Sequence, residues 1–261
     1  MTLGVRVDNL SLEEARQKAA DFLLGVRQIL IFTPNPEMLV KAQNDPYFRE
    51  VLNRGELNLC DGVGLAIAAR VKSLKSKVQS PKRITGVDFM TELCAMAEQK
   101  KYSIYLLGSQ SDEVVKKTAE NLIKKFPSLR IVGLDRGPLL SDCHSEQSEE
   151  SLLFAGKGSF TSVQDDTVSK INAAKPDILF VAFGMGKQEK WLAENLSKMP
   201  SVKIGMGVGG AFDYLSGLTP RAPRLMRELG LEWLYRLVKQ FLLTPCLCSC
   251  TRRSRLLVTP V

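Results

Sequence analysis

Short apolar runs alternate with amphipathic stretches along most of the chain. Each run ends in a polar or glycine-rich turn, and the clearest are residues 28–32, 102–108, 129–133, 177–184 and 202–208. Continuous apolar runs of this length are typical of strands buried on both faces of a parallel sheet. Two shorter runs, 5–7 and 57–60, predict further strands.

Helical periodicity fills most of the segments between these runs. Helices are predicted over residues 12–24, 37–43, 47–54, 85–99, 111–126, 167–174, 187–196 and 224–242, with a further helix starting at Leu65. Ser11 and Glu14 have the spacing of a capping box, which favours a helix start at residue 12. Strands that alternate with helices predict an α/β fold with a doubly wound, mostly parallel sheet and helices on both faces.

Three segments interrupt this alternation. Residues 73–82 are polar and basic without periodicity, which indicates a loop, and residues 212–219 look irregular. Residues 135–160 are polar and low in complexity, so we interpret them as a flexible surface insertion, which holds the lone histidine, His144. We therefore expect a catalytic domain over residues 1–219 and a basic, partly helical appendage over residues 220–261.

Composition is that of an ordinary globular protein. The 261 residues are 44% hydrophobic and 25% charged, which suits one large α/β domain with an appendage. No apolar run is long enough to span a bilayer, and the first residues lack the apolar core of a signal peptide. These features predict a cytoplasmic protein, in which the six cysteines are free thiols.

The basic residues are concentrated near the end of the chain. From Arg221 onward there are eight Lys or Arg against two Glu, so this segment carries a net charge of +6 out of the total of +8. Such a tail predicts an anionic partner, which is a phosphate, an acidic lipid or a nucleic acid. The alternative is a solvated helix face.

Four polar turns follow predicted strands. They begin at Thr33, Cys60, Gly184 and Gly205. In a parallel sheet the four turns share the carboxyl edge, which is where open α/β sheets bind ligands. Asp61 is the acidic residue of the second turn, and its alternative role is to cap the following helix.

Several familiar catalytic arrangements are missing. A lone histidine makes Ser-His-Asp or Cys-His machinery improbable, and neither a Walker A motif nor an Asp-x-Asp metal motif is present. A bound diphosphate would then be neutralised by arginine, from the set Arg83, Arg221, Arg224 and Arg227. Residues Gly205–Gly210 match G-x-G-x-x-G, which keeps a dinucleotide-binding oxidoreductase as an alternative.

The ordered motifs also carry a resemblance. They are Thr33-Pro34-Asn35, Asp61-Gly62-Val63-Gly64, Arg83-Ile84-Thr85-Gly86-Val87-Asp88, Leu106-Leu107-Gly108, Gly184-Met185-Gly186-Lys187-Gln188-Glu189-Lys190-Trp191, Gly207-Val208-Gly209-Gly210-Ala211-Phe212-Asp213, and Arg221-Ala222-Pro223 with Gly230-Leu231-Glu232-Trp233-Leu234-Tyr235-Arg236. Over residues 5–240 the chain resembles the WecG/TagA/CpsF glycosyltransferases. It departs from them at Gly186, where the family usually has Pro.

The resemblance implies a Rossmann-like domain that performs an inverting transfer from a UDP-sugar, without a cofactor. The implied donor is UDP-N-acetylmannosamine, and the acceptor is undecaprenyl-diphosphate-linked N-acetylglucosamine, in cell-wall or teichoic-acid-type synthesis. It also implies a homo-oligomer, and an appendage that reaches the inner face of the cell membrane and completes the site. No nucleic-acid partner is expected under this interpretation; a non-catalytic anion- or nucleic-acid-binding module is the third alternative.

Inverting transfer needs a base for the acceptor hydroxyl and charge stabilisation for the departing diphosphate. We interpret Asp61 as the base and expect Thr33 and Asn35 to orient the sugars. Contacts to the donor are expected from Gly184, Gln188, Gly209 and Asp213. We expect Arg83, Arg221 and Arg224 to stabilise UDP in place of a metal ion.

Overall fold

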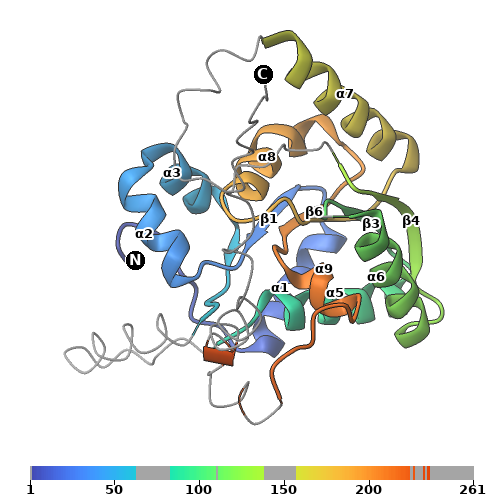
Figure 1. Cartoon of the computed structure of the whole chain (residues 1–261), viewed down its shortest axis with the longest axis horizontal. Helices are drawn as coiled ribbons and strands as arrows, with labels where there is room; N and C mark the ends of the chain where they lie inside the picture. The colour runs from blue at the N-terminus through green and yellow to red at the C-terminus, as the bar shows by residue number, and fades with distance from the viewer. Residues whose placement is uncertain are drawn as a thin grey trace, which may run out of the picture. The chain divides into compact units, whose positions relative to one another are not determined.

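The computed structural model describes residues 2–62, 83–109, 111–137 and 157–223, together with Met226, Glu232, Leu234 and Tyr235 (Figure 1). Within 157–165 it defines the helix but not the side chains. The chain divides into two compact units, Met1–Pro220 and Arg221–Val261. Every element below belongs to the first unit.

One parallel sheet organises this unit. Its strands are β1 (Ile29–Phe32), β2 (Leu57–Asn58), β3 (Ser103–Leu107), β4 (Arg130–Asp135), β5 (Ile178–Val181) and β6 (Ile204–Gly207), in the order β2-β1-β6-β5-β3-β4. All neighbouring strands run parallel; for example, Ile31 pairs with Leu57 of β2 and with Met206 of β6. The central strands are buried along their whole length, which explains their unbroken apolar sequences.

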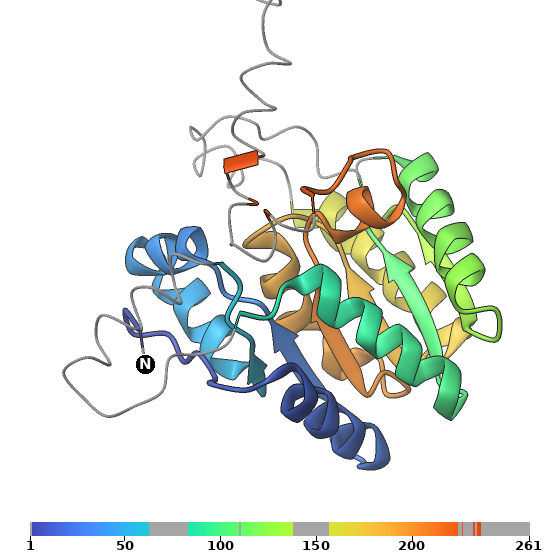
Figure 2. The ribbon, with the colours of Figure 1, turned by 90° about the horizontal axis from the view of Figure 1, so that it is seen from below.

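Helices cover both faces of the sheet (Figures 1 and 2). Four pack in one hydrophobic core: α1 (Leu12–Leu24), α5 (Gly86–Lys100), α6 (Asp112–Lys125) and α9 (Ala211–Leu215). The core on the opposite face takes α2 (Pro36–Asn44), α3 (Pro46–Arg54), α7 (Lys157–Ala174) and α8 (Lys187–Asn195), which continues into the 3₁₀ turn η2 (Leu196–Lys198). The predicted α/β class, with a parallel sheet between helical layers, is confirmed.

Local sequence accounts for where most helices begin. Ser11, Asn35, Asp45, Thr85 and Ser111 are N-caps whose side chains accept a backbone N–H from the first turn. The capping box predicted at the start of α1 is present, since the Ser11 hydroxyl and the Glu14 carboxylate satisfy each other's backbone donors. α2 and α3 also begin with proline, which suits a first helical position that has no partner for its N–H.

A few boundaries differ from the predictions. α7 begins at Lys157, ten residues before the predicted start and inside the predicted insertion. The prediction missed its first turns because residues 157–166 are mostly polar. The predicted strand at 5–7 is wrong: the segment makes only isolated bridges, Thr2 with Val5 and Asp8 with Leu59. The segment 212–219, predicted as irregular, contains most of α9. The predicted helix from Leu65, the loop 73–82 and most of the helix 224–242 lie outside the described residues.

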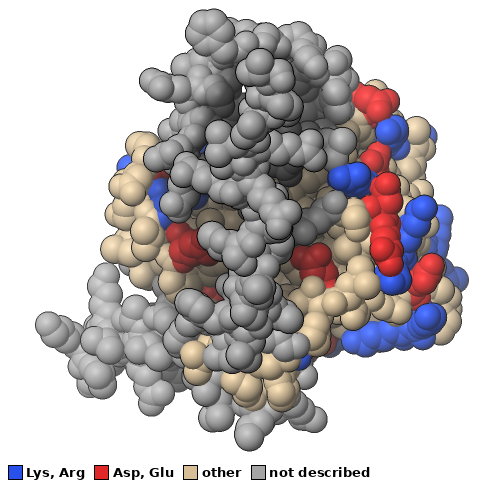
Figure 3. Space-filling model, viewed as in Figure 1, with Lys and Arg blue, Asp and Glu red and all other residues tan. Residues whose placement is uncertain are grey.

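Acidic and basic side chains are interspersed on the described part of the face that Figure 3 shows. Glu113 pairs with Lys117 on α6 at 2.6 Å, and Asp166 pairs with Lys170 on α7 at 2.9 Å. A mixed-sign surface of this kind does not by itself steer a polyanion. Among the described helices, none has the length and apolar character needed to cross a membrane.

Candidate active site

The four polar turns all lie at the carboxyl edge of the sheet, after β1, β2, β5 and β6. The neighbouring strands β1 and β6 send the chain to opposite faces. β1 leads to α2 in one core, and β6 leads to α9 in the other. Such a reversal is where open α/β sheets bind their ligands, so the fold places the predicted turns at the expected position.

Asp61 lies next to two other elements. Its backbone N–H donates to the carbonyl of Pro34 at 3.0 Å, which ties the turn after β2 to the turn after β1. Its carboxylate accepts the N–H of Gly86, at the start of α5, at 3.4 Å. Asp61 is not the N-cap of α5, because the Thr85 hydroxyl takes that position by accepting the Asp88 N–H at 3.2 Å. Its alternative role, as the cap of the helix predicted from Leu65, lies outside the described residues.

Thr33 sits against the same helix start. A Cβ atom at Gly86 would lie 3.3 Å from Thr33 Oγ1, so glycine allows the hydroxyl to approach the backbone closely. Three residues from separate elements therefore meet here. Thr33 follows β1, Asp61 follows β2, and Gly86 is the first residue of α5. Gly86 belongs to the motif Arg83–Asp88 of the sequence analysis, but its role as the meeting point is visible only in the structure.

Asn35 has a defined structural task. Its side-chain oxygen accepts the Met38 N–H at 2.8 Å and caps α2. A contact from Asn35 to a sugar would therefore have to come from its amide nitrogen.

The charges of Asp61 and Arg83 act on one buried thiol. The pKa of Cys60 is raised to about 11, first by burial and then by the Asp61 carboxylate, while the Arg83 guanidinium opposes the rise. Arg83 and Asp61 therefore both act electrostatically on Cys60, the residue that precedes the candidate base. At neutral pH the Cys60 thiol is protonated and does not serve as a nucleophile.

Gln188 and Gly209 are also brought together. The Gln188 side-chain oxygen accepts the Gly209 N–H at 2.9 Å, and its nitrogen donates to the Glu189 carboxylate at 2.7 Å. Gln188 is buried, so these bonds lie inside the protein. Glu189 was missed by sequence reasoning, because a helical Glu is usually a surface residue.

Gly184 and Asp213 border the same turns. Gly184 is exposed at a φ of +86°, and open space surrounds the position where a Cβ would lie. Asp213, on α9, has a carboxylate oxygen 3.5 Å from the Cβ position of Gly210. Both residues are therefore at the carboxyl edge of β5 and β6, as predicted.

Arg221 belongs to the second unit, where its Nε lies 3.3 Å from a carboxylate oxygen of Glu232. Arg224 lies outside the described residues. The predicted grouping of these two arginines with Arg83 stays a prediction.

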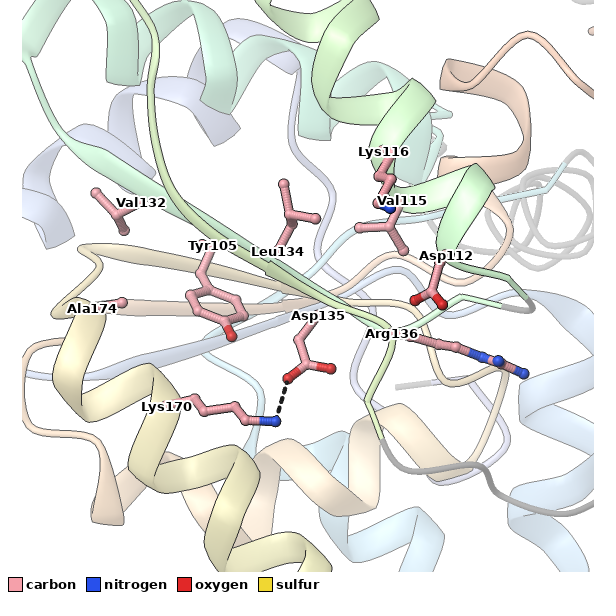
Figure 4. A pocket seen from close by; sticks show the side chains of 11 residues that line it. Tyr105, Asp112, Val115, Lys116, Val132, Leu134, Asp135, Arg136, Lys170 and Ala174 are labelled. Atoms are coloured by element: carbon pink, nitrogen blue, oxygen red, sulfur yellow. Dashed lines mark hydrogen bonds and ion pairs between the residues drawn. The ribbon is translucent and has the colours of Figure 1, made fainter.

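A hollow of about 610 Å³ lies elsewhere, along the edge strand β4 (Figure 4). Tyr105, Asp135 and Lys170 line one side of the strand, with 3.3 Å between the Lys170 amine and the Asp135 carboxylate. Leu134, Val115 and Lys116 line the other side. None of the predicted site residues lines this hollow, so we assign it no part in the chemistry.

The sequence analysis also considered a metal ion and a bound dinucleotide. In the described part of the chain, no group of three or more His, Cys, Asp or Glu side chains is placed to hold a metal ion. The G-x-G-x-x-G match at Gly205–Gly210 is followed by α9, which has five residues. A dinucleotide site uses the N-terminus of a long helix, so the oxidoreductase alternative gains no support.

Known proteins match most of the chain. The model of the family described as "Glycosyl transferase WecG/TagA/CpsF family" matches residues 1–242. The N-acetylglucosaminyldiphosphoundecaprenol N-acetyl-beta-D-mannosaminyltransferase of Bacillus subtilis (strain 168) is 33% identical over 211 residues, which cover 80% of this chain and 71% of that protein. The protein of the same name from Staphylococcus aureus (strain NCTC 8325) is 28% identical over 237 residues, covering 90% and 82%.

Proposed function

Because the chain belongs to the WecG/TagA/CpsF family of glycosyltransferases, we propose that it transfers N-acetylmannosamine to N-acetylglucosaminyl diphosphoundecaprenol. The relatives carry this acceptor and this sugar in their names, and the family assignment makes the protein a hexosyltransferase. The donor in this proposal is UDP-N-acetylmannosamine, and the product serves cell-wall or teichoic-acid-type polysaccharide synthesis. The family match over residues 1–242 carries the proposal, and the meeting of Asp61, Thr33 and Gly86 at the carboxyl edge supplies a place for the chemistry.

Asp61 is the general base in this proposal. Its carboxylate takes the proton of the acceptor hydroxyl while that oxygen attacks the anomeric carbon of the donor sugar. The bond from the anomeric carbon to the diphosphate oxygen breaks, and UDP leaves with the electron pair. The 3.4 Å contact with the Gly86 N–H is long for a hydrogen bond, and it orients the carboxylate at the start of α5.

Neighbouring residues position the two substrates. Thr33 presents its hydroxyl at Gly86, the residue whose N–H the Asp61 carboxylate accepts, and there it can hold a sugar hydroxyl. Arg83, two residues before the N-cap of α5, supplies a positive charge for the developing diphosphate in this proposal. Gly184, Gly209 and Asp213 would line the donor site at the ends of β5 and β6.

The second unit provides membrane contact in this proposal. Its eight Lys and Arg residues suit an anionic lipid surface, and the lipid-linked acceptor resides in a membrane. Arg221 and Arg224 would complete the charge stabilisation of UDP from this unit. The protein then works as a peripheral protein at the inner face of the cell membrane, with a homo-oligomer as its expected assembly.

A donor screen tests the proposal. Purified protein is incubated with a short-chain lipid diphosphate N-acetylglucosamine acceptor and a panel of UDP-sugars, and released UDP is measured. We expect release with UDP-N-acetylmannosamine that requires the acceptor. Acceptor-dependent release with another UDP-sugar alone would overturn the donor assignment, and NAD binding without any UDP release would overturn the function.

A further inference from the structure

The glycine turns after β5 and β6 are joined by one buried chain of hydrogen bonds. Glu189 accepts the N–H of Gly186 with one carboxylate oxygen and the side-chain nitrogen of Gln188 with the other, both at 2.7 Å. Gln188 then accepts the N–H of Gly209 at 2.9 Å. These three hydrogen bonds therefore link the turn that starts α8 to the turn that leads into α9.

The carboxylate fixes the direction of every bond in this chain. With both oxygens accepting, Glu189 requires Gln188 to turn its nitrogen inward. Gln188 must then present its oxygen to Gly209, which can only donate. An amide at position 189 would have one acceptor for two donors, so either Gly186 or Gln188 would lose its partner.

Burial makes this arrangement expensive to break. Only 1% of Glu189 and 5% of Gln188 is exposed. Burial raises the pKa of Glu189, while the hydrogen bonds from Gln188 and Gly186 and the charge of Lys41 oppose the rise. A buried carboxylate of this kind is retained at a cost in stability, and one well-attested use is to specify a single local structure.

The backbone around these hydrogen bonds leaves little space for a side chain at Gly207. A Cβ atom at Gly207, the last residue of β6, would lie 3.0 Å from the Gln188 nitrogen and 3.2 Å from a Glu189 oxygen. Gly209 itself has a φ of +51°, a conformation that favours glycine. The Gln188 oxygen thus holds the turn at Gly209, where few residue types other than glycine adopt the required backbone conformation.

We propose that Glu189 is a positioning residue for the sugar-nucleotide donor, which acts through Gln188 to hold the Gly209 turn in its binding conformation. The inference rests on the proposed function, in which the turns after β5 and β6 bind the nucleoside diphosphate. Glu189 makes no contact with the donor itself, because its carboxylate is buried. A turn held in place before binding lowers the entropy lost when the diphosphate docks.

Glu189→Gln gives the first test, with donor kinetics and UDP affinity as readouts. We expect the KM for the UDP-sugar and the Kd for UDP to rise about fivefold to a hundredfold, as one buried donor loses its acceptor. The kcat falls less, because the base at Asp61 is unaffected. Glu120→Gln, on the exposed face of α6, makes the same chemical change and leaves both constants unaltered.

The paired substitution Gln188→Glu with Glu189→Gln provides a rescue. The new carboxylate at 188 accepts both the Gly209 N–H and the amide nitrogen at 189, whose oxygen still accepts the Gly186 N–H. All three hydrogen bonds return, and only the one between the two side chains reverses its direction. We therefore expect UDP affinity to recover towards the wild-type value.

The outcomes separate this inference from the function beneath it. Unchanged UDP affinity in folded Glu189→Gln overturns the positioning role, and so does an equal loss in the folded single and paired variants. If the single variant does not fold, the paired variant decides alone: near wild-type UDP affinity supports the role, and lost affinity overturns it. Wild-type protein that fails to bind UDP overturns the proposed function and this inference with it.

Discussion

The Asp61 carboxylate lies 3.4 Å from the backbone nitrogen of Gly86, at the first residue of α5. The contact exists because β2 ends opposite the start of this helix, and Thr85 rather than Asp61 caps the helix. The carboxylate is thus oriented by the helix without being needed to hold it. This separation of roles makes Asp61 a suitable base and makes its replacement informative.

Asp61→Asn should abolish most of the transfer while the protein stays folded. The amide keeps an oxygen for the Gly86 N–H but does not take up a proton at neutral pH, so kcat should fall about 10²- to 10⁴-fold. The measurement is UDP release with a short-chain lipid acceptor, together with a thermal unfolding curve. Asp112→Asn, at the exposed start of α6, is the matched control. Near wild-type turnover in folded Asp61→Asn would show that the base is elsewhere.

Gly86→Ala should reduce activity without loss of stability. The added methyl group would lie 3.3 Å from Thr33 Oγ1, so the hydroxyl must shift away from the start of α5 by a few tenths of an ångström. Alanine is a better helix former than glycine, which offsets the crowding. We expect kcat to fall about tenfold to a hundredfold with little change in Tm. Gly25→Ala, at the exposed end of α1, serves as the control, and an unaltered kcat in Gly86→Ala would remove Thr33 from the site.

Asp45 should make the protein sensitive to acid. Burial acts to raise the pKa of Asp45, but hydrogen bonds from Lys190, at 2.6 Å, and from the Phe48 N–H lower it overall. A lowered carboxyl pKa stabilises the fold above the unfolded value, near pH 4, and this contribution is lost as the pH falls through the folded value.

Asp45→Asn isolates that contribution, because asparagine is an equally good N-cap for α3. We expect the variant to be less stable at pH 7 by roughly 0.5–1 kcal/mol, as for other solvent-accessible ion pairs. The difference should shrink in urea unfolding measurements as the pH falls below the unfolded value and through the lowered folded value, because both proteins then carry an uncharged group there. A difference that is the same at pH 3 and pH 7 would assign the effect to packing.

Activity is expected to persist without a divalent cation. The sequence lacks the Asp-x-Asp motif that holds a metal ion against a diphosphate, and Arg83 offers the charge that the leaving group needs. Transfer measured after dialysis against EDTA should equal that of untreated protein. Activity that is lost in EDTA and restored by Mg²⁺ or Mn²⁺ would contradict the arginine role.

The basic tail should bind anionic membranes. We expect the protein to float with vesicles that contain phosphatidylglycerol but not with pure phosphatidylcholine, and salt should weaken the binding. Arg252→Glu with Arg253→Glu should reduce flotation, whereas Lys124→Glu with Lys125→Glu, on exposed positions of α6, should not. An equal loss in both pairs would show that total charge, not the tail, governs the interaction.

Local sequence was sufficient for most of the fold. Caps such as Ser11 and Asn35, and proline at the first position of α2 and α3, set where helices begin through contacts within a few residues. Buried runs such as the one that became β5 indicated a parallel sheet, because only a strand covered on both faces is apolar throughout. Local patterns failed at the start of α7, whose first turns are mostly polar and resemble a surface loop in sequence.

The sequence by itself therefore determined the order of the elements, the parallel sheet and the turns that carry the candidate chemistry. It also identified Asp61 as the acidic residue at a strand end. Only the tertiary structure decided that Gly86 is the neighbour of Asp61, that Thr85 caps α5 in its place, and that Glu189 is a buried partner of Gln188. The reason is physical: caps and periodicity depend on residues within one or two turns. Contacts across the sheet edge depend on the strand order, which is set by packing between distant parts of the chain.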